Sequence, residues 1–411
     1  MYKNIVYYSK RYIIMIERKQ YLDKLIALKD KQLIKVITGI RRCGKSTLFK
    51  LYQDYLLKNG ISKEQIQMIN FEDIINEDLQ DYKKLYKHIL DNSVKDKKNY
   101  IFLDEIQNVP QFQKTVDSLY IKDNFDIYIT GSNAYLLSGE LATLLSGRYI
   151  EIQMLPLSFK EYISSFEGNT NTQQLFAKYL ENGSFPYILQ IQNELNVKKD
   201  YLKAILDSIL IKDVIARNKI SNVDELHRIL RFMFDNIGNI CSIKKISDTM
   251  TSAGFKIVPK TVEKYITSLI ESFVLYSVSR YDIKGKQYLQ SGEKYYIADT
   301  GLRNTLLNKN SDVGRLIENT VYLELIRRGY QVFIGKTNTT EVDFVANKDN
   351  ETVYFQVAQT ILAEDILNRE LKPLQNIKDN YPKYLLTLDY LPQTDYNGIK
   401  QINIIDWLLD K

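Results

Sequence analysis

Cysteine is scarce in this sequence: there are two, Cys43 and Cys241, and they lie far apart in a chain of 411 residues. We therefore expect neither a disulfide framework nor a cysteine-based zinc site. Two histidines occur, His88 and His227, and we expect both to be ordinary helix residues. No stretch is apolar enough to span a membrane, which takes roughly 20 apolar residues. These shortages indicate a cytoplasmic protein.

The composition that remains is ordinary for a globular protein, with 45% hydrophobic residues, 26% charged residues and a net charge of +6. The length gives room for roughly two to four domains. The mild positive excess suits a polyanionic partner without requiring one. Residues 1–14 contain no small-residue cleavage site, so a secretory signal is not indicated. Because a cleaner amphipathic segment begins at Met15, we expect Met15 to be the natural start and residues 1–14 to be an upstream extension.

The most informative segment is 39–46, which carries the complete G-x-x-x-x-G-K-[ST] pattern of a phosphate-binding loop. An apolar stretch of strand length, 33–38, precedes it, and a helical stretch, 47–52, follows it. The glycines let backbone N–H groups turn toward a triphosphate, Lys45 reaches its β- and γ-phosphates, and Ser46 offers a hydroxyl to Mg²⁺. A simple glycine turn is the alternative that this context disfavours. The predicted nucleotide-binding residues are Gly39, Ile40, Arg41, Arg42, Cys43, Gly44, Lys45, Ser46 and Thr47.

Two acids follow an apolar run, since residues 100–103 lead directly into Asp104 and Glu105. Such a run is typical of a buried parallel strand that delivers acids to its carboxyl end. We predict that Asp104 holds Mg²⁺, directly or through water, and that Glu105 polarises the attacking water. A strand end with two solvated acids is the alternative.

Further strands are predicted at 67–71, 125–130 and 146–155, and they alternate with helical stretches. This order predicts a parallel α/β sheet whose ligand site lies at the carboxyl ends of the strands. Residues 131–133 follow one of these strands, and a polar side chain there could touch the γ-phosphate or the attacking water. We assign residues 1–155 to this core.

A helical lid and a winged helix are predicted next. Residues 156–222 are mostly helical in pattern, and residues 223–300 show three helices followed by a β-ribbon. The third helix, 260–272, should turn an apolar face inward, formed by Val262, Tyr265, Ile266 and Leu269.

Lysines on this winged-helix outline could contact double-stranded DNA. Lys260 and Lys264 point outward from the third helix, and Lys284 and Lys286 lie at the turn of the ribbon. In a DNA-binding winged helix the third helix enters the major groove and a basic wing tip touches phosphate. Alternatively, the module serves only for packing and its lysines are solvated. Lys244, Lys245 and Lys256 are further candidates for the same footprint.

The C-terminal part, 301–411, has a helix followed by three strand-like pieces. This order resembles the core of PD-(D/E)XK nucleases, in which one strand offers Asp and the next offers Glu-x-Lys to a Mg²⁺ site. Asp343 and Glu318 are present, but Gln356 stands at the Glu position and Ala358 at the Lys position. We therefore predict an α/β nuclease-like fold without nuclease activity. A lysine from elsewhere, for example Lys336, could restore catalysis.

Segments from nearly the whole chain together resemble one family, the prokaryotic AAA-type P-loop ATPases with a winged helix and an uncharacterised nuclease-like C-terminal domain. The segments that carry this resemblance are 39–46, 103–107, 130–133, 145–148, 183–186, 296–302, 318–319 and 341–344. The resemblance implies that the nucleotide is ATP, that Asn133 senses the γ-phosphate, and that Arg148 acts near it as an arginine finger from a neighbouring subunit. A solvated arginine at a strand edge is the alternative for Arg148. Arg41 and Arg42 match the family's loop, where they could contact phosphates or a partner.

These features predict an ATPase with ATP and Mg²⁺ as cofactors, whose hydrolysis moves the core relative to its other parts. The predicted parts are the core 1–155, the lid 156–222, the winged helix 223–300 and the C-terminal domain 301–411. A finger from a neighbouring subunit would require a homo-oligomer. Two alternatives stay open: an ATP-switched module that binds DNA or a protein partner with little turnover, and a metal-dependent nuclease.

Overall fold

The computed structural model describes residues 15–411 except 135–144, 146, 167, 169–170, 192–193, 286, 309–311, 338–339 and 393. The chain divides into two compact units: one extends to Pro156 and includes Glu271–Phe273, and the other comprises Leu157–Ile270 and Val274–Lys411. The expected upstream extension, 1–14, lies outside the described residues. Of the helices that the structure describes, none is long and apolar enough to cross a membrane.

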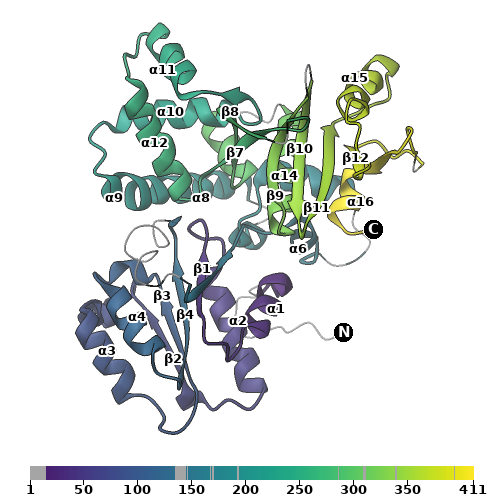
Figure 1. Ribbon diagram of the computed structural model, residues 1–411. Coiled ribbons are helices and arrows are strands. Elements are labelled where there is room, and N and C mark those ends of the chain that lie inside the picture. The colour runs from purple at the N-terminus through teal and green to yellow at the C-terminus, as the bar shows by residue number, and fades with distance from the viewer. Residues whose placement is uncertain are drawn as a thin grey trace. The chain divides into compact units, whose positions relative to one another are not determined.

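The first unit is built on a five-stranded sheet in the order β2-β3-β4-β1-β5, and every neighbouring pair of strands is parallel (Figure 1). Its strands are β1 (Ile34–Thr38), β2 (Ile66–Asn70), β3 (Asn99–Asp104), β4 (Phe125–Gly131) and β5 (Tyr149–Gln153). All residues of β1, β3 and β4 are buried, as expected for parallel strands that are covered on both faces. The predicted parallel α/β core is therefore confirmed.

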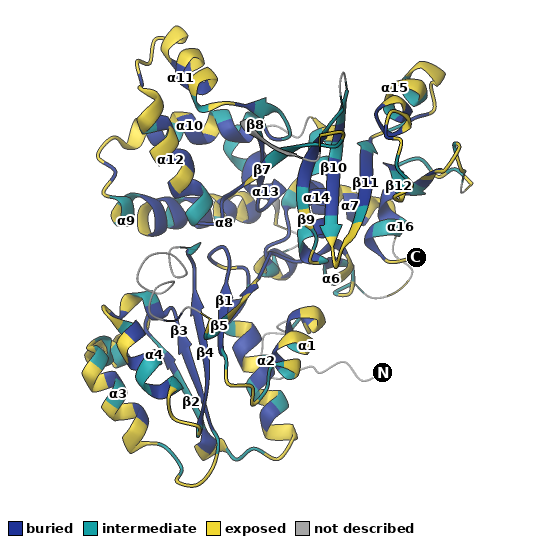
Figure 2. Ribbon diagram, in the orientation of Figure 1, coloured by how far each residue is buried: buried dark blue, intermediate teal, exposed yellow. Residues whose placement is uncertain are grey.

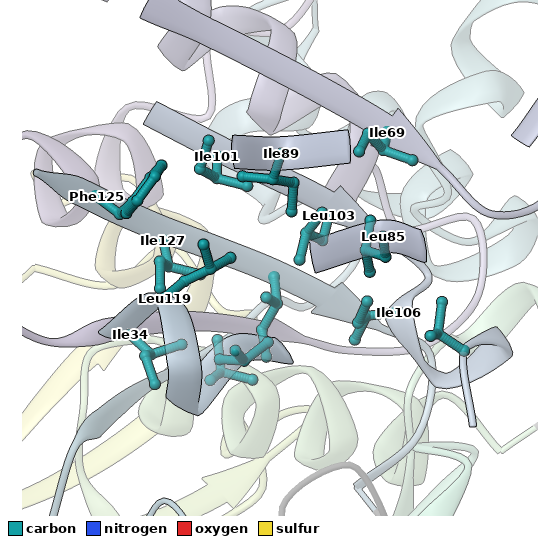
Figure 3. Close-up of a cluster of buried hydrophobic side chains, with 14 of the residues drawn as sticks. Ile34, Ile69, Leu85, Ile89, Ile101, Leu103, Ile106, Leu119, Phe125 and Ile127 are labelled. Carbon is teal, nitrogen blue, oxygen red and sulfur yellow. The ribbon is translucent and has the colours of Figure 1, made fainter. Parts of the chain in front are cut away.

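Helices cover both faces of this sheet. Ile101 and Leu103 belong to a buried cluster that also contains side chains of α3 (Tyr82–Asp91) and α4 (Phe112–Tyr120) (Figure 3). Phe102, between them in β3, contacts the ring of Phe49 in α2 (Lys45–Lys58), with centroids 5.0 Å apart. The side chains of successive β3 residues thus point to opposite faces of the sheet. The outward sides of the helices are exposed (Figure 2). The smaller elements of the unit are α1 (Lys19–Ala27), η1 (Lys63–Gln65), η2 (Ile74–Gln80) and η3 (Ile106–Asn108).

The second unit begins with helices and ends with a mixed α/β part. Its first helices are α6 (Phe159–Ile163), α7 (Thr172–Asn182), η5 (Pro186–Gln190) and α8 (Leu195–Ser208), which continues through the π-helical η6 (Ile209–Ile215) into α9 (Ala216–Asn218). The later helices are α10 (Val223–Asp235), α11 (Ile243–Ser252), α12 (Pro259–Glu271), α13 (Thr300–Leu307), α14 (Val313–Arg327), α15 (Glu364–Gln375) and α16 (Ile404–Leu408). In α12 the four predicted inward residues are buried, whereas Lys260 and Lys264 are exposed.

An eight-stranded mixed sheet runs through the second unit in the order β13-β12-β11-β10-β9-β7-β8-β6. Its strands are β6 (Ile240–Cys241), β7 (Leu275–Asp282), β8 (Gln287–Ile297), β9 (Gln331–Lys336), β10 (Glu341–Lys348), β11 (Glu351–Ala358), β12 (Lys383–Thr387) and β13 (Ile399–Asn403). The predicted ribbon, β7 and β8, joins the C-terminal strands because β7 pairs with β9 in parallel, Arg280 opposite Ile334. The boundaries predicted within residues 156–411 stay predictions, but the sheet crosses the one at residue 300.

Two segments that carry the family resemblance, 183–186 and 296–302, are packed against each other. Asp299 is buried, and its Oδ2 accepts hydrogen bonds from the backbone N–H and the hydroxyl of Ser184 at 2.5 and 2.9 Å. Its Oδ1 accepts from the Leu302 N–H at 3.1 Å and so caps α13. Gly183 has a φ of 78°, and a Cβ atom there would lie 2.1 Å from Asp299 Oδ1. Both segments therefore have a structural role in joining α7 to α13.

Replacing Gly183 with alanine should destabilise the second unit strongly. With a φ of 78° and a ψ of −169°, Gly183 lies in a backbone region that is open essentially to glycine and that costs an L-residue roughly 1 to 3 kcal/mol, and the clash with Asp299 adds about 1 to 3 kcal/mol. Gly254 is the matched control, because its φ is 88° and a Cβ atom there meets nothing within 4 Å. Urea unfolding should show a clearly larger loss for Gly183→Ala than for Gly254→Ala. Equal losses would show that the Gly183–Asp299 contact does not matter.

Candidate functional site

The predicted phosphate loop joins the carboxyl end of β1 to the amino end of α2. Gly39 has a φ of 144°, and a Cβ atom there would lie 2.1 Å from the carbonyl oxygen of Met154. Gly44 precedes α2 in the left-handed region, with a φ of 109°. The backbone therefore requires both glycines of the pattern, the first for close approach and the second for its dihedral angle.

The other loop residues differ in exposure. Ile40 and Cys43 are buried, and Arg42 and Thr47 are exposed. The Arg41 guanidinium forms an ion pair with Glu72, at 2.6 Å between Nη1 and Oε1. Because Glu72 follows β2 at the same end of the sheet, Arg41 ties the loop to that segment, whereas Arg42 faces solvent.

Lys45 lies in the first turn of α2 with its side chain buried. Its ammonium donates a hydrogen bond to the Gly39 carbonyl oxygen at 3.0 Å and lies 3.6 Å from Glu105 Oε1. A phosphate oxygen is a stronger partner for an ammonium than a backbone carbonyl is. The lysine is therefore held at the loop in a position from which it can move to an anionic ligand.

Thr130 of β4 links the two predicted acids: Asp104 ends β3 and Glu105 follows it. Its hydroxyl donates to Asp104 Oδ1 at 2.5 Å and accepts from the Glu105 N–H at 2.9 Å. Within the described residues, Asp104 Oδ2 is buried and makes no hydrogen bond. Burial raises the pKa of Asp104, and the neighbouring Ser46 and Thr130 hydroxyls oppose that rise. Asp104 and Ser46 thus lie together, and one carboxylate oxygen is left for a cation.

Glu105 has a left-handed backbone, with a φ of 55°, and directly precedes the turn η3. This conformation is uncommon for a residue other than glycine. Its Oε2 accepts a hydrogen bond from Gln107 Nε2 at 2.5 Å. Burial acts to raise the pKa of Glu105, but the Lys45 charge, the Gln107 hydrogen bond and the Arg41 charge outweigh it and lower the pKa. Glu105 is therefore an oriented, ionised carboxylate at neutral pH.

Asn133 lies just beyond the end of β4 and is fully buried. Because β4 lies between β3 and β1 in the sheet, Asn133 reaches the edge where the loop and the acids lie. A contact of 3.5 Å between Gln107 Nε2 and Ser132 Oγ joins the segments that follow β3 and β4. Residues predicted from three separate stretches therefore gather at one edge: Lys45, Ser46, Asp104, Glu105 and Asn133.

Arg148 lies elsewhere. Its carbonyl oxygen accepts from the Ile34 N–H at 2.8 Å, at the amino end of β1, whereas the loop follows the carboxyl end of that strand. Five residues of strand span about 16 Å. The Arg148 side chain forms an ion pair with Asp117 and lies over the ring of Tyr120, 5.4 Å from its centroid. Within its own chain Arg148 is therefore not brought to the loop, and its role toward a neighbouring subunit stays a prediction.

Sequence reasoning missed Arg18 as a support of the loop. Its buried guanidinium donates to the Cys43 carbonyl oxygen at 2.8 Å and to the Leu155 carbonyl oxygen at 2.6 Å. No local pattern marks an arginine whose partners lie 25 and 137 positions away. Gln107 and Thr130, by contrast, lie inside segments that carry the family resemblance.

Comparison with known proteins identifies two matching families along the chain. Residues 31–163 match a family described as an AAA domain, and residues 173–313 match a domain of unknown function. The chain is 42% identical over 402 residues to an uncharacterised protein of Haemophilus influenzae, covering 96% of this chain and 99% of that protein. It is 35% identical over 376 residues to an uncharacterised protein of Methanocaldococcus jannaschii, covering 86% and 82%.

The fold is similar to that of the Walker-type ATPase of Pyrococcus abyssi. The match has a TM-score of 0.50 and 15% sequence identity, and covers 73% of this chain and 98% of that protein. Together with the AAA-domain match, this likeness confirms the predicted AAA-type α/β fold. The winged helix and the nuclease-like character of residues 301–411 stay predictions.

Arg18→Met should destabilise the first unit, because it leaves two buried carbonyl oxygens without their charged donor. An acceptor left unsatisfied in this way costs about 1 to 3 kcal/mol. Arg148→Met is the matched control, since the Arg148 side chain is 41% exposed and an exposed ion pair contributes at most about 1 kcal/mol. Urea unfolding measures both losses. A loss for Arg18→Met no larger than that for Arg148→Met would contradict the supporting role of Arg18.

Proposed function

The chain belongs to the family of the Haemophilus and Methanocaldococcus proteins above, and we propose that it is an ATPase that binds ATP with Mg²⁺ and hydrolyses it. The observation that carries this proposal is the position of Lys45, whose ammonium lies between the Gly39 carbonyl and Glu105. A phosphate loop, a lysine, a hydroxyl and two carboxylates at one sheet edge are the parts that phosphoryl transfer to water uses.

Binding of the triphosphate is assigned to the loop and the start of α2. The backbone N–H groups that follow Gly39 surround the phosphates, and the amino end of α2 adds its positive dipole. Lys45 exchanges the Gly39 carbonyl for the β- and γ-phosphate oxygens. This exchange also releases the Lys45 ammonium from Glu105, which frees the carboxylate to face water.

The residues present fit a magnesium ion. Among the residues that the structure describes, Asp104 Oδ2 is a buried carboxylate oxygen that accepts no hydrogen bond, and the Ser46 hydroxyl lies beside that carboxylate. Carboxylate and hydroxyl oxygens suit the hard Mg²⁺ ion, which keeps several waters and contacts phosphate. Ser46 and Asp104 would hold it, and its charge would neutralise the β- and γ-phosphates. Thr130 fixes the Asp104 carboxylate by its hydrogen bond to Oδ1.

Glu105 is proposed as the base that accepts a proton from the attacking water. Support comes from the Gln107 hydrogen bond and the Arg41 charge, which lower its pKa and do not depend on Lys45, and from its backbone conformation. Gln107 holds one Glu105 oxygen through Nε2, while Gln107 Oε1 is buried and makes no hydrogen bond within the described residues. We assign Gln107 a positioning role: Nε2 orients the carboxylate, and Oε1 is available to accept from the same water.

Asn133 and Arg148 complete the proposal. The burial of Asn133 at the same edge supports contact of its amide with the γ-phosphate. Arg148 could serve only the site of a neighbouring subunit, because it lies beside the amino end of β1. That role requires a homo-oligomer.

A second candidate function is DNA binding by residues 223–300, proposed as a winged helix. The supporting observation is the asymmetry of α12, which buries its apolar face while Lys260 and Lys264 are exposed. Lys284 is exposed at the turn between β7 and β8. Lys286, the other wing lysine, lies outside the described residues. Such lysines would neutralise phosphates and make binding depend on salt.

Glu105→Gln should abolish turnover while ATP binding persists, because the amide cannot accept the proton. Loss of a general base lowers kcat by about 10² to 10⁴. Steady-state phosphate release and ATP affinity are measured on wild type, Glu105→Gln, Lys45→Ala and the exposed-acid control Glu64→Gln. Lys45→Ala should lose both binding and turnover. Wild-type turnover in Glu105→Gln would refute the base, and ATP binding without phosphate release by wild type would favour an ATP switch.

Lys260→Glu/Lys264→Glu should weaken binding to double-stranded DNA uniformly across sequences. Each lost phosphate contact lowers the slope of log K against log salt by about 1, so the double variant should lower it by about 2. Lys372→Glu/Lys378→Glu makes the same charge change at exposed positions elsewhere in the unit and serves as the control. Equal effects of the two pairs, or affinity indifferent to salt, would remove the DNA candidate.

A further inference from the structure

Lys294 in β8 faces three carboxylates. Its side chain is 5% exposed, and its ammonium lies 3.1 Å from Glu318 Oε1, 2.9 Å from Glu341 Oε1 and 3.7 Å from Asp343 Oδ1. Glu318 belongs to α14, and the other two acids begin β10. One ammonium thus joins two strands and a helix that are far apart in the sequence.

The acids around Lys294 are held by further hydrogen bonds. The Tyr296 hydroxyl donates to Glu318 Oε1 at 2.7 Å, and the Val357 N–H donates to Asp343 Oδ2 at 2.9 Å. Gln356, at the predicted Glu position, turns its Nε2 to Glu370 Oε2 at 3.0 Å. The Gln356 Oε1 accepts from the Asp343 N–H at 3.3 Å. The Gln356 amide is neutral itself, and it joins a further acid, Glu370, to Asp343.

Three partly buried carboxylates that lie this close together need a cation beside them or must take up protons, because like charges out of water repel strongly. A divalent metal is one cation that can hold carboxylates together, with carboxylate oxygens at about 2.0 to 2.6 Å from the ion. As the described side chains stand, no group of three or more His, Cys, Asp or Glu residues is arranged to hold a metal ion. Here the Lys294 ammonium lies among the acids.

We propose that Lys294 is the resident cation of this centre: its ammonium occupies the position that a divalent ion would need, so the native chain binds no divalent ion there. Lys294 was not among the predicted residues, and the lysine suggested for this place was Lys336. The inference is independent of the ATPase proposal, since it concerns residues of the second unit alone. A centre that binds no divalent ion also lacks the metal on which nuclease activity there would depend.

The same cation explains why three segments of the family resemblance meet. Segment 296–302 contributes Tyr296, segment 318–319 contributes Glu318, and segment 341–344 contributes two acids. An ammonium supplied by the chain itself makes this junction independent of the ion supply, whereas a bound metal would make it depend on that supply. The ion pairs of Lys294 thereby hold β8, α14 and β10 together.

Removing the ammonium should convert the centre into a divalent-cation site. Mn²⁺ binding to the nucleotide-free, full-length chain is measured by electron paramagnetic resonance for wild type, Lys294→Ala and Lys294→Ala/Asp343→Asn. Lys294→Ala should bind one more Mn²⁺ per chain than wild type, and the added Asp343→Asn change should remove that ion. Any Mn²⁺ held at the phosphate loop cancels, because the loop is identical in all variants.

Lys383→Ala is the matched control, since Lys383 is also largely buried in this unit but, in the described part of the chain, faces a single carboxylate, Asp379, at 3.7 Å. It should gain no ion. A folded Lys294→Ala that binds no more Mn²⁺ than wild type would overturn the proposal. Should Lys294→Ala not fold, wild type and Asp343→Asn decide: equal Mn²⁺ binding supports a resident ammonium, and less binding by Asp343→Asn overturns it.

Discussion

A buried charge needs an opposite charge beside it, and this constraint shapes both units. Lys35, near the amino end of β1, is fully buried and pairs with the equally buried Asp126 of β4. Burial lowers the pKa of Lys35, and the Asp126 charge opposes that effect. The pair joins β1, which leads into the phosphate loop, to β4, which leads to Asn133. The same logic recurs where Lys45 meets Glu105 and where Lys294 meets three acids.

Parallel pairing of the strands in the first unit brings the predicted site residues together. Since β3, β4 and β1 are neighbours with the same direction, the polar residues after each strand meet at one edge. Thr130 then links the ends of two strands through one hydroxyl, which accepts from Glu105 and donates to Asp104. The two acids are therefore held by Thr130. Lys45, whose partners are a backbone carbonyl and a carboxylate, can exchange them for an anionic ligand.

In the second unit, the segments that carry the family resemblance are explained by their packing rather than by a chemical role. Asp299 caps α13 and binds Ser184, and the buried Asn319 amide bonds both backbone groups of Ile297, at 2.8 and 3.0 Å. Such residues make a family recognisable without making it an enzyme. The eight-stranded sheet contains strands from both sides of residue 300. The strands of the predicted wing and the C-terminal strands therefore belong to one hydrogen-bonded sheet.

The sequence by itself determined the phosphate loop, the acids after β3 and the parallel sheet, because glycine spacing, apolar runs and strand–helix alternation are local patterns. It also determined which face of α12 is buried. Only the tertiary structure decided that Arg18 supports the loop, that Arg148 lies at the far end of β1, and that Lys294 lies among three acids. Those outcomes depend on which strands become neighbours and in what register, and no local pattern encodes the partner of a side chain that lies dozens of residues away.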